Sequence, residues 1–344
     1  MKTIFVVDDS DTNLAKVEEA LEERYRVMTM PSAAKMFALL EKITPDLILL
    51  DIEMPEMNGF QALEHLKASE SETLAEIPVM FLTGHADSAV EAHGFELGAV
   101  DLVTKPFSAP VLLNRIKTHL DIDEVIRERT SQLYQLQNAL VAVLADMVEN
   151  RDKATSGHVE RTSQYIKILI NEMKERGVYS DEIHGWDTEK MISSARMHDL
   201  GKIAVTDIIL NKSEKLTNEE YELIKVHAAE GERIIEEIIS RTGEGDFLHN
   251  AKLFAGYHHE RWDGKGYPHA LNGTEIPLQG RIMAIVDTYD ALISDKPYKK
   301  PHTHEEAMGI IKEGAGKQYD PQIVDIFLAA QAQIKDVMER LQQL

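Results

Sequence analysis

The sequence predicts two domains of different fold class, a doubly wound α/β domain followed by an all-α helical bundle. Three observations lead to this prediction. At 344 residues the chain is long for one compact domain, so two domains with a connector are expected. The first 120 residues alternate short apolar runs with amphipathic segments. From about residue 148 onward, apolar residues recur three and four positions apart instead.

The short apolar runs of the first part predict five strands. Each run is bounded by turn-forming or acidic residues, and the runs cover 3–9, 25–30, 46–52, 78–84 and 101–107. Helix-like segments, such as 12–24 and 31–43, lie between them. Strands that alternate with helices form a parallel sheet with helices on both faces. We therefore expect residues 1–120 to form the α/β domain.

A connector without glycine or proline follows at 121–147. Leu133, Leu136, Leu140 and Leu144 fall at helical spacing, and Met147 continues the series. One interpretation is a single amphipathic helix packed on its own domain. The other is a coiled coil with a second chain, which would make the protein a homodimer and pass a signal. About two heptads favour pairing only slightly.

Residues 148–344 are expected to form the helical domain. Apolar residues at helical spacing predict helices within 155–175, 188–199, 217–240, 247–260 and 280–294. Thr217 and Glu220 have the spacing of a capping box at one helix start. The run HTH at 302–304 is expected to be a solvated loop.

Composition excludes several classes of protein. The net charge of −22 argues against DNA as a partner, because long phosphate backbones would be repelled. No apolar run approaches the roughly 18 residues that a membrane span needs, and the short apolar start is expected to be a strand. The chain has no cysteine, which fits a reducing compartment. Together these features predict a cytoplasmic protein.

Acidic residues close the first and third predicted strands, with Asp8 and Asp9 at one and Asp51 at the other. In a parallel sheet the carboxyl ends of the strands meet at one edge, so these carboxylates should converge. Three acids in one pocket repel each other unless a hard cation such as Mg²⁺ lies among them. Thr83 and Lys105 end the fourth and fifth strands and add a hydroxyl and an amine to the same edge.

This pattern resembles the response-regulator receiver domain over residues 1–120, through the acid pair, DIEMPEMNG at 51–59, LTG at 82–84 and TKPF at 104–107. The resemblance implies a flavodoxin-like fold and a sensor histidine kinase as partner. It implies the following roles: Asp51 as phosphoryl acceptor, Asp8, Asp9 and the backbone of Glu53 around Mg²⁺, Thr83 and Lys105 on the phosphoryl oxygens, and a cis Lys105–Pro106 bond. Leu102 stands where receivers often carry an aromatic switch residue.

In the second part, histidines and aspartates gather on four predicted helices. The six candidates for metal ligands are His198, Asp199, His227, His258, His259 and Asp287. Such residues can line a metal pocket at a bundle core. A lone histidine is more often a packing residue, but two adjacent pairs followed by a glycine loop make coincidence improbable. Lys202, with Lys296, Lys299 and Lys300, would supply positive charge for phosphate.

This donor set suits two-metal hydrolysis of a phosphate ester. Two metal ions a few ångströms apart need a bridging carboxylate and terminal histidines, and they can hold a hydroxide that attacks phosphorus in line. Histidine-rich ligation without thiolates favours Fe or Mn, with Co or Ni as alternatives, over Mg²⁺ alone.

These residues resemble the HD-GYP family of cyclic-dinucleotide phosphodiesterases over about 148–330. The motifs are HDLGKI at 198–203, HHERWDGKGYP at 258–268 and RIMAIVDTYDALISDKPY at 281–298. The resemblance implies that the six candidates are metal ligands with Asp199 as the bridge, and that Lys202 and Lys299 contact phosphate. The loop residues Asp263, Gly264, Gly266, Tyr267 and Pro268 would shape the substrate mouth.

Two positions depart from the family pattern. Some members hold a third metal with a glutamate where this chain has Ala154, so we predict two metals. His158 would then be an extra ligand or a substrate contact. Lys296, a further substrate contact, stands where an arginine is common and cannot offer a bidentate fork.

The leading hypothesis is a response regulator whose output domain hydrolyses cyclic di-GMP, either to pGpG alone or onward to GMP, controlled by phosphorylation of Asp51. One alternative is hydrolysis of 3′,3′-cyclic GMP-AMP or of pGpG itself. Another is a regulator without catalysis that binds a nucleotide or a diguanylate cyclase partner. In either case phosphorylation is expected to act through the helix at 121–147.

Overall fold

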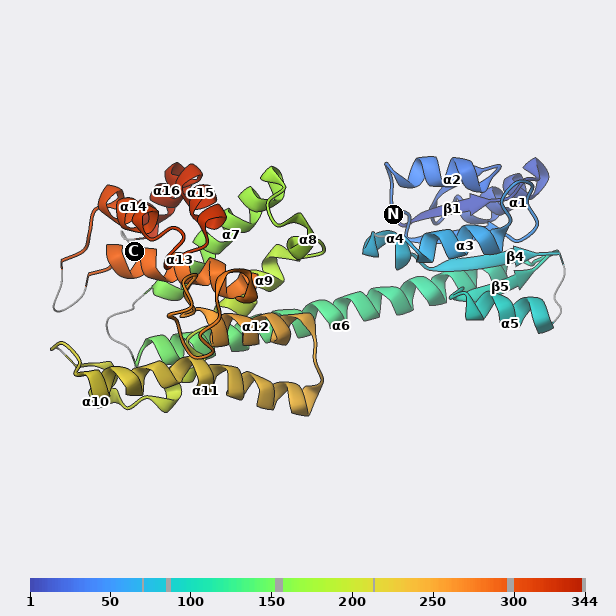
Figure 1. Cartoon of the computed structure of the whole chain (residues 1–344). Helices are drawn as coiled ribbons and strands as arrows, with labels where there is room; N and C mark the ends of the chain where they lie inside the picture. Colours follow the sequence, from blue (N-terminus) through green and yellow to red (C-terminus); the bar gives the residue numbers. More distant parts are fainter. Residues whose placement is uncertain (70, 85–87, 152–156, 213, 296–299, 342–344) are drawn as a thin grey trace. The chain divides into compact units, whose positions relative to one another are not determined.

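The computed structural model describes residues 1–69, 71–84, 88–151, 157–212, 214–295 and 300–341. It divides into two compact units, Met1–Leu133 and Tyr134–Leu344. Figure 1 labels their helices and strands. Each unit is described on its own below.

The first unit contains a five-stranded parallel sheet of order β2-β1-β3-β4-β5. The strands are β1 (Thr3–Val7), β2 (Arg26–Met30), β3 (Leu47–Asp51), β4 (Val79–Thr83) and β5 (Asp101–Thr104). All five predicted strands are therefore present. Residues along β1 alternate between two cores, with Ile4 and Val6 on one face and Phe5 and Val7 on the other. The predicted doubly wound α/β fold is confirmed.

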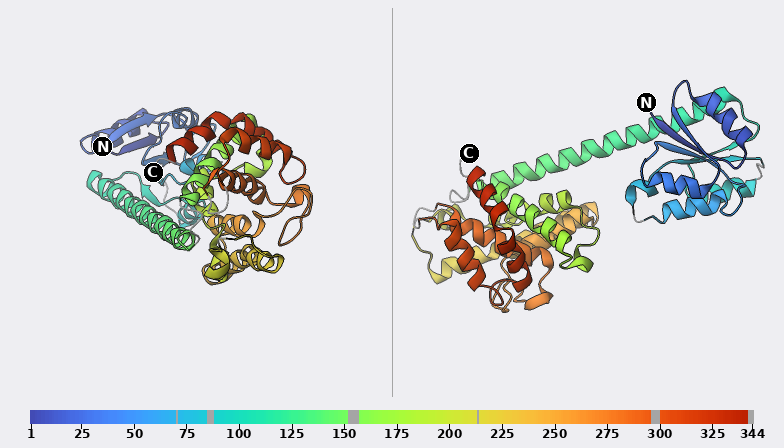
Figure 2. Two further views of the ribbon diagram at one scale, coloured as in Figure 1. Left: turned by 90° about the vertical axis from the view of Figure 1, so that its left-hand side faces the viewer. Right: turned by 90° about the horizontal axis from the view of Figure 1, so that it is seen from above.

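Helices cover both faces of this sheet. On one face, α1 (Asp11–Leu21) and the start of α6 (Ala109–Glu149) contribute to one core. On the other face, α2 (Ala33–Leu40) and α3 (Gly59–Lys67) contribute to the second core, with α4 (Glu72–Ala75) and α5 (Ser88–Glu96) beside them. Figure 2 shows the sheet with helices on both sides. The loops after β1 and β3 are left free to form a pocket at the carboxyl edge.

The helix α6 is continuous over 41 residues and crosses the division between the units. The connector predicted at 121–147 is therefore the later part of a longer helix, because this stretch has no glycine and its single proline, Pro110, lies in the first turn, where proline is tolerated. Near its end, α6 buries Val141, Ala145 and Val148. The leucine series is largely exposed among the described residues, from 45% at Leu144 to 66% at Leu133.

The second unit is helical in all of its described elements of regular structure. These are α7 (His158–Arg176), α8 (Ser180–Ile183), α9 (Thr188–Ala195), η1 (Leu200–Ala204), α10 (Asp207–Leu210), α11 (Asn218–Thr242), α12 (Asp246–Tyr257), η2 (Gly273–Glu275), α13 (Leu278–Ile293), α14 (His304–Glu313), α15 (Pro321–Ala329) and α16 (Gln331–Leu341). The predicted capping box of Thr217 and Glu220 begins α11. The predicted helical bundle is confirmed.

The core of this unit lies around α7 and α13. Tyr165 on α7 meets Tyr289 on α13 edge-on, with ring centroids 5.2 Å apart. The prediction of a solvated loop at 302–304 holds for His302 and Thr303 but is wrong for His304, which begins α14 and is buried. The Nδ1 atom of His304 lies 2.7 Å from the Tyr289 hydroxyl, which supplies the polar partner that burial demands. None of the described helices is both long and apolar enough to cross a membrane.

Candidate metal centre and acidic pocket

The acidic pocket of the first unit forms where β1 and β3 end. Asp8 and Asp51 are buried there, Asp9 is exposed, and their carboxylate oxygens lie within 4.8 Å of one another. The Lys105 ammonium joins two of them, at 2.6 Å from Asp8 Oδ2 and 2.9 Å from Asp51 Oδ1. Asn13 donates a further hydrogen bond to Asp8. The predicted convergence of these side chains is present.

The electrostatics of this pocket follow from its burial. Burial raises the pKa of the Asp51 carboxyl, and the hydrogen bond and charge of Lys105 oppose this only in part. For Lys105, burial alone would lower the pKa, but Asp8 and Asp51 outweigh it and the pKa is raised. Thr83 is buried at the end of β4, and Glu53 is exposed after β3. The Lys105–Pro106 bond is cis, as predicted.

In the second unit, imidazole and carboxylate groups form two adjacent clusters. The first consists of His227, His258 and His259, and the second of His158, His198 and Asp199. Within each cluster the candidate ligand atoms lie within 4.8 Å of one another. Five of the six sequence-predicted metal ligands thus fall into these clusters. Asp287 lies at the edge of the second, with Oδ1 3.5 Å from His158 Nε2.

Four helical segments bring these side chains together. His158 begins α7, His198 and Asp199 follow α9, His227 lies within α11, and His258 and His259 follow α12. The segment that carries the first pair packs directly on α11. A Cβ atom on Gly201 would lie 1.9 Å from the His227 carbonyl oxygen, so only glycine permits this approach. The glycine in HDLGK therefore has a structural reason that the sequence motif did not reveal.

Backbone carbonyls fix the tautomers of three of the histidines. A carbonyl oxygen only accepts hydrogen bonds, so each Nδ1 facing one must carry the proton and leave Nε2 as a bare lone pair. The contacts are His198 Nδ1 to Ala195, His227 Nδ1 to Ile224 and His258 Nδ1 to Ala255, at 2.9, 2.7 and 2.9 Å.

The Nε2 atoms of the clustered histidines face one another across short gaps. His227 Nε2 lies 3.1 Å from the Nε2 atoms of both His258 and His259, and His158 Nε2 lies 3.3 Å from His198 Nε2. For His227 and His258, whose Nδ1 atoms both face carbonyls, two lone pairs at 3.1 Å repel and form no hydrogen bond. A cation that all of them can donate to removes the conflict, and neutral imidazole is a common ligand of transition metals. The donor set therefore fits metal ions.

Asp199 lies between the two clusters. Its Oδ1 atom is 3.5 Å from His227 Nε2, and its Oδ2 atom is 3.4 Å from His198 Nε2. Lys202 approaches Oδ2 at 2.8 Å. Burial would raise the pKa of the Asp199 carboxyl, but Lys202 and the neighbouring histidines hold it well below its usual range. An ionised carboxylate with one oxygen toward each cluster can bridge two cations.

The first cluster is kept neutral by its burial. Burial lowers the pKa of His227, and lowers that of His258 well below its usual range. Burial, followed by the nearby His227, lowers the pKa of His259 to about 3. These rings therefore carry free lone pairs at neutral pH, which is the state that binds metal.

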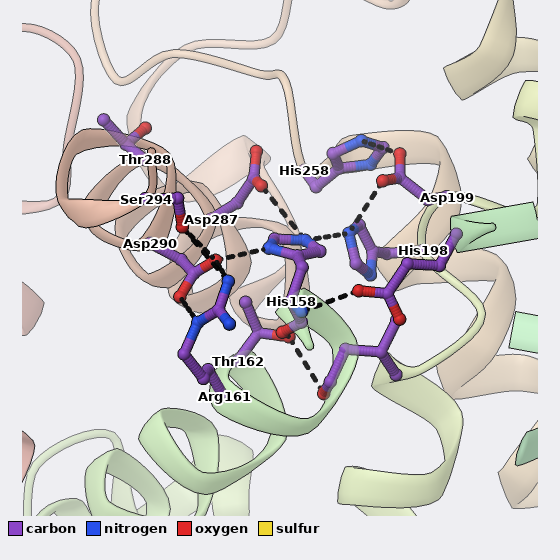
Figure 3. A network of polar contacts seen from close by, with 12 residues as sticks. His158, Arg161, Thr162, His198, Asp199, His258, Asp287, Thr288, Asp290 and Ser294 are labelled. Atoms are coloured by element: carbon purple, nitrogen blue, oxygen red, sulfur yellow. Dashed lines mark hydrogen bonds and ion pairs between the residues drawn. The ribbon is translucent and has the colours of Figure 1, made fainter. Parts of the chain in front are cut away.

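His158 belongs to the second cluster. The sequence predicted this residue only as an extra ligand or a substrate contact. Figure 3 shows its ring between Asp290 on one side and His198 on the other. Its Nδ1 atom donates to Asp290 Oδ2 at 2.8 Å, and Arg161 holds the same carboxylate. Sequence reasoning missed both partners. A signal was present, since each lies three residues after a recognised position, Asp290 after Asp287 and Arg161 after His158.

A pocket of about 920 Å³ opens over the two clusters. It lies at the upper end of the 300–1,000 Å³ usual for small-ligand sites. Besides the clusters, its polar and aromatic lining includes Lys202, Lys212, Tyr221, Arg261, Tyr267 and Gln318. Lys296 and Lys299, the other predicted phosphate contacts, lie outside the described residues, as does Ala154.

The loop after His259 shapes one wall of this pocket. Gly264 has a φ of 73°, and a Cβ on Gly266 would lie 2.4 Å from the Arg261 nitrogen, so both glycines are required sterically. Arg261 grips Asp263 with two hydrogen bonds of 3.0 and 2.9 Å. The Tyr267 ring stacks on His259 with centroids 4.8 Å apart, and the Tyr267–Pro268 bond is cis. The loop thus covers a candidate ligand with an aromatic ring.

A buried glutamate that the sequence analysis did not single out holds this loop closed. The Glu260 carboxylate accepts hydrogen bonds from three consecutive backbone N–H groups, those of residues 269, 270 and 271, at 2.7 to 3.0 Å. Glu260 is 2% exposed.

The end of α6 contacts two segments of the site. The Glu149 carboxylate accepts from the His158 backbone N–H at 2.6 Å, at the start of α7. Arg151 donates to the Lys202 and Val205 carbonyl oxygens, at 3.3 and 2.9 Å, and to Asp207 at 2.8 Å. The segments that carry His158 and Lys202 are therefore both fastened to the same helix end.

Two family models match the chain. The response regulator receiver domain matches residues 4–117, and the HD domain matches residues 142–323.

Several characterised or named proteins are similar along the chain. A probable cyclic di-GMP phosphodiesterase of Vibrio cholerae is 38% identical, over 98% of this chain and 80% of that protein. The cyclic di-GMP phosphodiesterase response regulator RpfG of Xanthomonas campestris pv. campestris is 30% identical, over 97% and 89%. A 3′3′-cGAMP-specific phosphodiesterase 2 of Vibrio cholerae is 34% identical, over 57% of this chain and 35% of that protein.

Proposed function

The chain belongs to the response regulators that join a receiver domain to an HD domain, and on this premise we propose that its HD domain hydrolyses cyclic di-GMP. The product is pGpG, or GMP where the same site also cuts the linear dinucleotide. The similarity to the cyclic di-GMP phosphodiesterases of Vibrio and Xanthomonas along almost the whole chain supports this substrate. The pocket over the histidine clusters has room for a dinucleotide.

The observation that carries the proposal is the pair of facing histidine clusters joined by Asp199. We assign one metal ion to His227, His258 and His259, and a second to His158, His198 and Asp287, with Asp199 shared by both. The nitrogen-rich set favours Fe or Mn, with Co or Ni as alternatives. When bound, such a pair supplies Lewis acidity and a nucleophile at neutral pH for in-line attack on phosphorus.

The chain's own side chains complete the site. Lys202 lines the pocket 2.8 Å from Asp199, so it is placed to neutralise a phosphate that approaches the clusters. Lys296 and Lys299 are proposed to add to this charge. Tyr267 and the loop at 263–268 close one side of the pocket, which limits the access of bulk water to the reacting phosphate.

In the receiver domain, we assign Asp51 as the phosphoryl acceptor and a sensor histidine kinase as the donor. Asp8 and Asp9, with the backbone of Glu53, would hold Mg²⁺, for which oxygen ligands are suited. Thr83 and Lys105 would contact the phosphoryl oxygens. The Lys105 ammonium already bridges Asp8 and Asp51, so it can follow the charge that appears on Asp51.

We propose that phosphorylation of Asp51 acts on the HD domain through α6. Its connector part at 121–147 has an exposed leucine series suited to pairing in a homodimer. Its end fastens the segments that carry His158 and Lys202, through Glu149 and Arg151. A displacement of this helix end would therefore reach a candidate metal ligand and a candidate phosphate contact together.

A second candidate substrate is 3′,3′-cyclic GMP-AMP. The similarity to a 3′3′-cGAMP-specific phosphodiesterase over 57% of this chain favours it. The two cyclic dinucleotides differ in one purine base, so competition between them in a single reaction separates the two proposals.

The test is product analysis by anion-exchange chromatography, with purified protein, Mn²⁺ and cyclic di-GMP. We expect a peak of pGpG or GMP that vanishes with a chelator. No product from protein that carries two metal ions would contradict the substrate and turn attention to 3′,3′-cyclic GMP-AMP or pGpG. No product and no bound metal would contradict the enzyme and leave a binding module for a nucleotide or a diguanylate cyclase.

A further inference from the structure

His158 differs from the other anchored histidines of the metal centre in what holds its Nδ1 atom. His198, His227 and His258 each donate to a backbone carbonyl three residues earlier in the chain. His158 donates instead to the Asp290 carboxylate, on another helix. Asp290 in turn accepts from Arg161 (Figure 3).

We propose that Asp290 and Arg161 are positioning residues that fix His158 as a ligand of one of the two metal ions. The inference rests on the proposed binuclear centre and adds two residues to it. Neither residue is assigned to contact metal or substrate itself. Their role is to set the tautomer, the orientation and the donor strength of one ligand.

The hydrogen bonds of Asp290 suit it to position His158 and leave it poorly placed to bind metal itself. Arg161 Nε lies 2.6 Å from Oδ1 and Nη2 lies 2.9 Å from Oδ2, which is a bidentate fork. Oδ2 also accepts hydrogen bonds from His158 Nδ1 and, at 3.4 Å, from the Ser294 hydroxyl. With both oxygens occupied, Asp290 is held as an anchor for His158. It does not compete with Asp287 as a ligand.

The burial of these three side chains requires the hydrogen bonds between them. Asp290 is 1% exposed, and His158 and Arg161 are also buried. A buried carboxylate needs both charge and hydrogen bonds to stay ionised, and here the arginine supplies the charge. The paired carboxylate raises the basicity of the imidazole, as carboxylate partners of metal-bound histidines generally do. His158 should therefore be a stronger donor than a histidine held by a neutral carbonyl.

The predicted consequence is selective for one ion. Loss of the anchor should weaken binding at the cluster of His158, His198 and Asp199. The cluster of His227, His258 and His259 should stay intact, because its anchored histidines are held by carbonyls of their own helices. Substitutions of such supporting residues weaken metal binding by roughly 10–100-fold.

The chain offers a matched control. Asp320 is another buried carboxylate of the same domain, paired with buried Arg281 at 3.0 Å, and neither residue lines the pocket. Asp290→Asn and Asp320→Asn each remove one buried charge from an arginine pair. Both variants should lose stability, so any effect on metal that is confined to Asp290→Asn cannot come from destabilisation alone.

The experiment measures Mn²⁺ content per chain by mass spectrometry across a series of chelator-buffered free Mn²⁺ concentrations. We expect two ions in the wild type and in Asp320→Asn. For Asp290→Asn, we expect one ion with unchanged affinity and a second weakened by roughly 10–100-fold. The magnetic coupling between neighbouring Mn²⁺ ions should disappear from the electron paramagnetic resonance spectrum at concentrations that fill only one position.

If Asp290→Asn does not fold, Arg161→Lys serves instead, since it keeps the charge and loses the fork. We expect a smaller weakening of the same single ion. Two ions bound with wild-type affinity in the folded variant would overturn the inference. Fewer than two ions in the wild type would overturn the binuclear centre itself, so the two failures are distinguishable.

Discussion

The two candidate sites of this protein concentrate charge in opposite ways. In the receiver domain, Asp8 follows β1 and Asp51 is the last residue of β3. These two strands are neighbours in the parallel sheet, so the sheet itself brings the two carboxylates together. In the HD domain, the clustered groups come from four helical segments and are mostly nitrogen atoms. One site is made of oxygen ligands beside an amine, and the other of imidazoles around one shared carboxylate.

The difference teaches what each architecture must supply. A parallel sheet places strand-end side chains at one edge without further help, so the acidic pocket needs few supporting contacts. Helices offer no such common edge. Each anchored histidine therefore has its own partner at Nδ1, and Asp199 depends on Lys202 and on the neighbouring histidines to remain ionised in a buried place.

The largest expected effect comes from Asp199→Ala, which removes the only group assigned to both ions. We expect metal content to fall and turnover of cyclic di-GMP to drop by at least about a thousandfold, because several kcal/mol of charge stabilisation are lost. Beryllofluoride binding to the receiver domain should be unchanged. Retained turnover with two bound ions would contradict the assignment of Asp199 to both metal ions.

An exchange of metal ions sharpens the contrast between oxygen and nitrogen ligands. After chelation, Mg²⁺ alone should restore beryllofluoride binding at Asp51, because hard cations prefer carboxylate oxygen. It should restore little phosphodiesterase activity, whereas Mn²⁺ or Fe²⁺ should restore it in full. Beryllofluoride binding, followed by fluorine nuclear magnetic resonance, and product formation can be measured on the same sample. Full activity with Mg²⁺ alone would contradict the assigned ligand set.

The connection between the sites is tested by Arg151→Gln, which unfastens the Lys202 segment from α6. We expect metal content to persist and stability to fall by about 1 kcal/mol, since the contacts with Asp207 are partly exposed. The ratio of rates with and without beryllofluoride should move toward one. Asp51→Asn provides the reference in which that ratio equals one. An Arg151→Gln ratio equal to that of the wild type would exclude this route.

The smallest expected effect concerns a histidine that is buried but is not assigned to a metal ion. His304 is buried in the HD domain and is not assigned as a ligand, and burial lowers its pKa from 6.5. Its unfolded form therefore takes up a proton first as pH falls through about 6.5, so its contribution to stability is present above that pH and lost below it. His304→Gln should flatten the slope of the unfolding free energy between pH 7.5 and pH 5.5, measured by urea unfolding. An unchanged slope would contradict a buried neutral ring.

Much of this architecture follows from sequence patterns with a direct physical basis. Alternating strands and helices predict the sheet, and strand-end acids predict that Asp8, Asp9 and Asp51 converge. Periodicity could not show that the connector is continuous with the preceding helix, because a helical pattern carries no mark of where a domain ends. The run HTH at 302–304 hides a helix start, because Thr303 is a helix cap and only His304 after it enters α14. Asp290 and Arg161 look like ordinary charges in sequence, since their pairing spans 129 residues.

The anchoring of the histidines also implies an order of assembly. His198, His227 and His258 take their metal-ready tautomer from a carbonyl within one turn of chain, so each is prepared as soon as its own segment forms. His158 waits for Asp290, 132 residues later. Contacts of such separation form late because the intervening loop must close first. In the cluster of His227, His258 and His259, the anchored histidines can thus reach the tautomer that binds metal before the domain is complete. In the second cluster, His158 reaches it only after α7 has packed against α13.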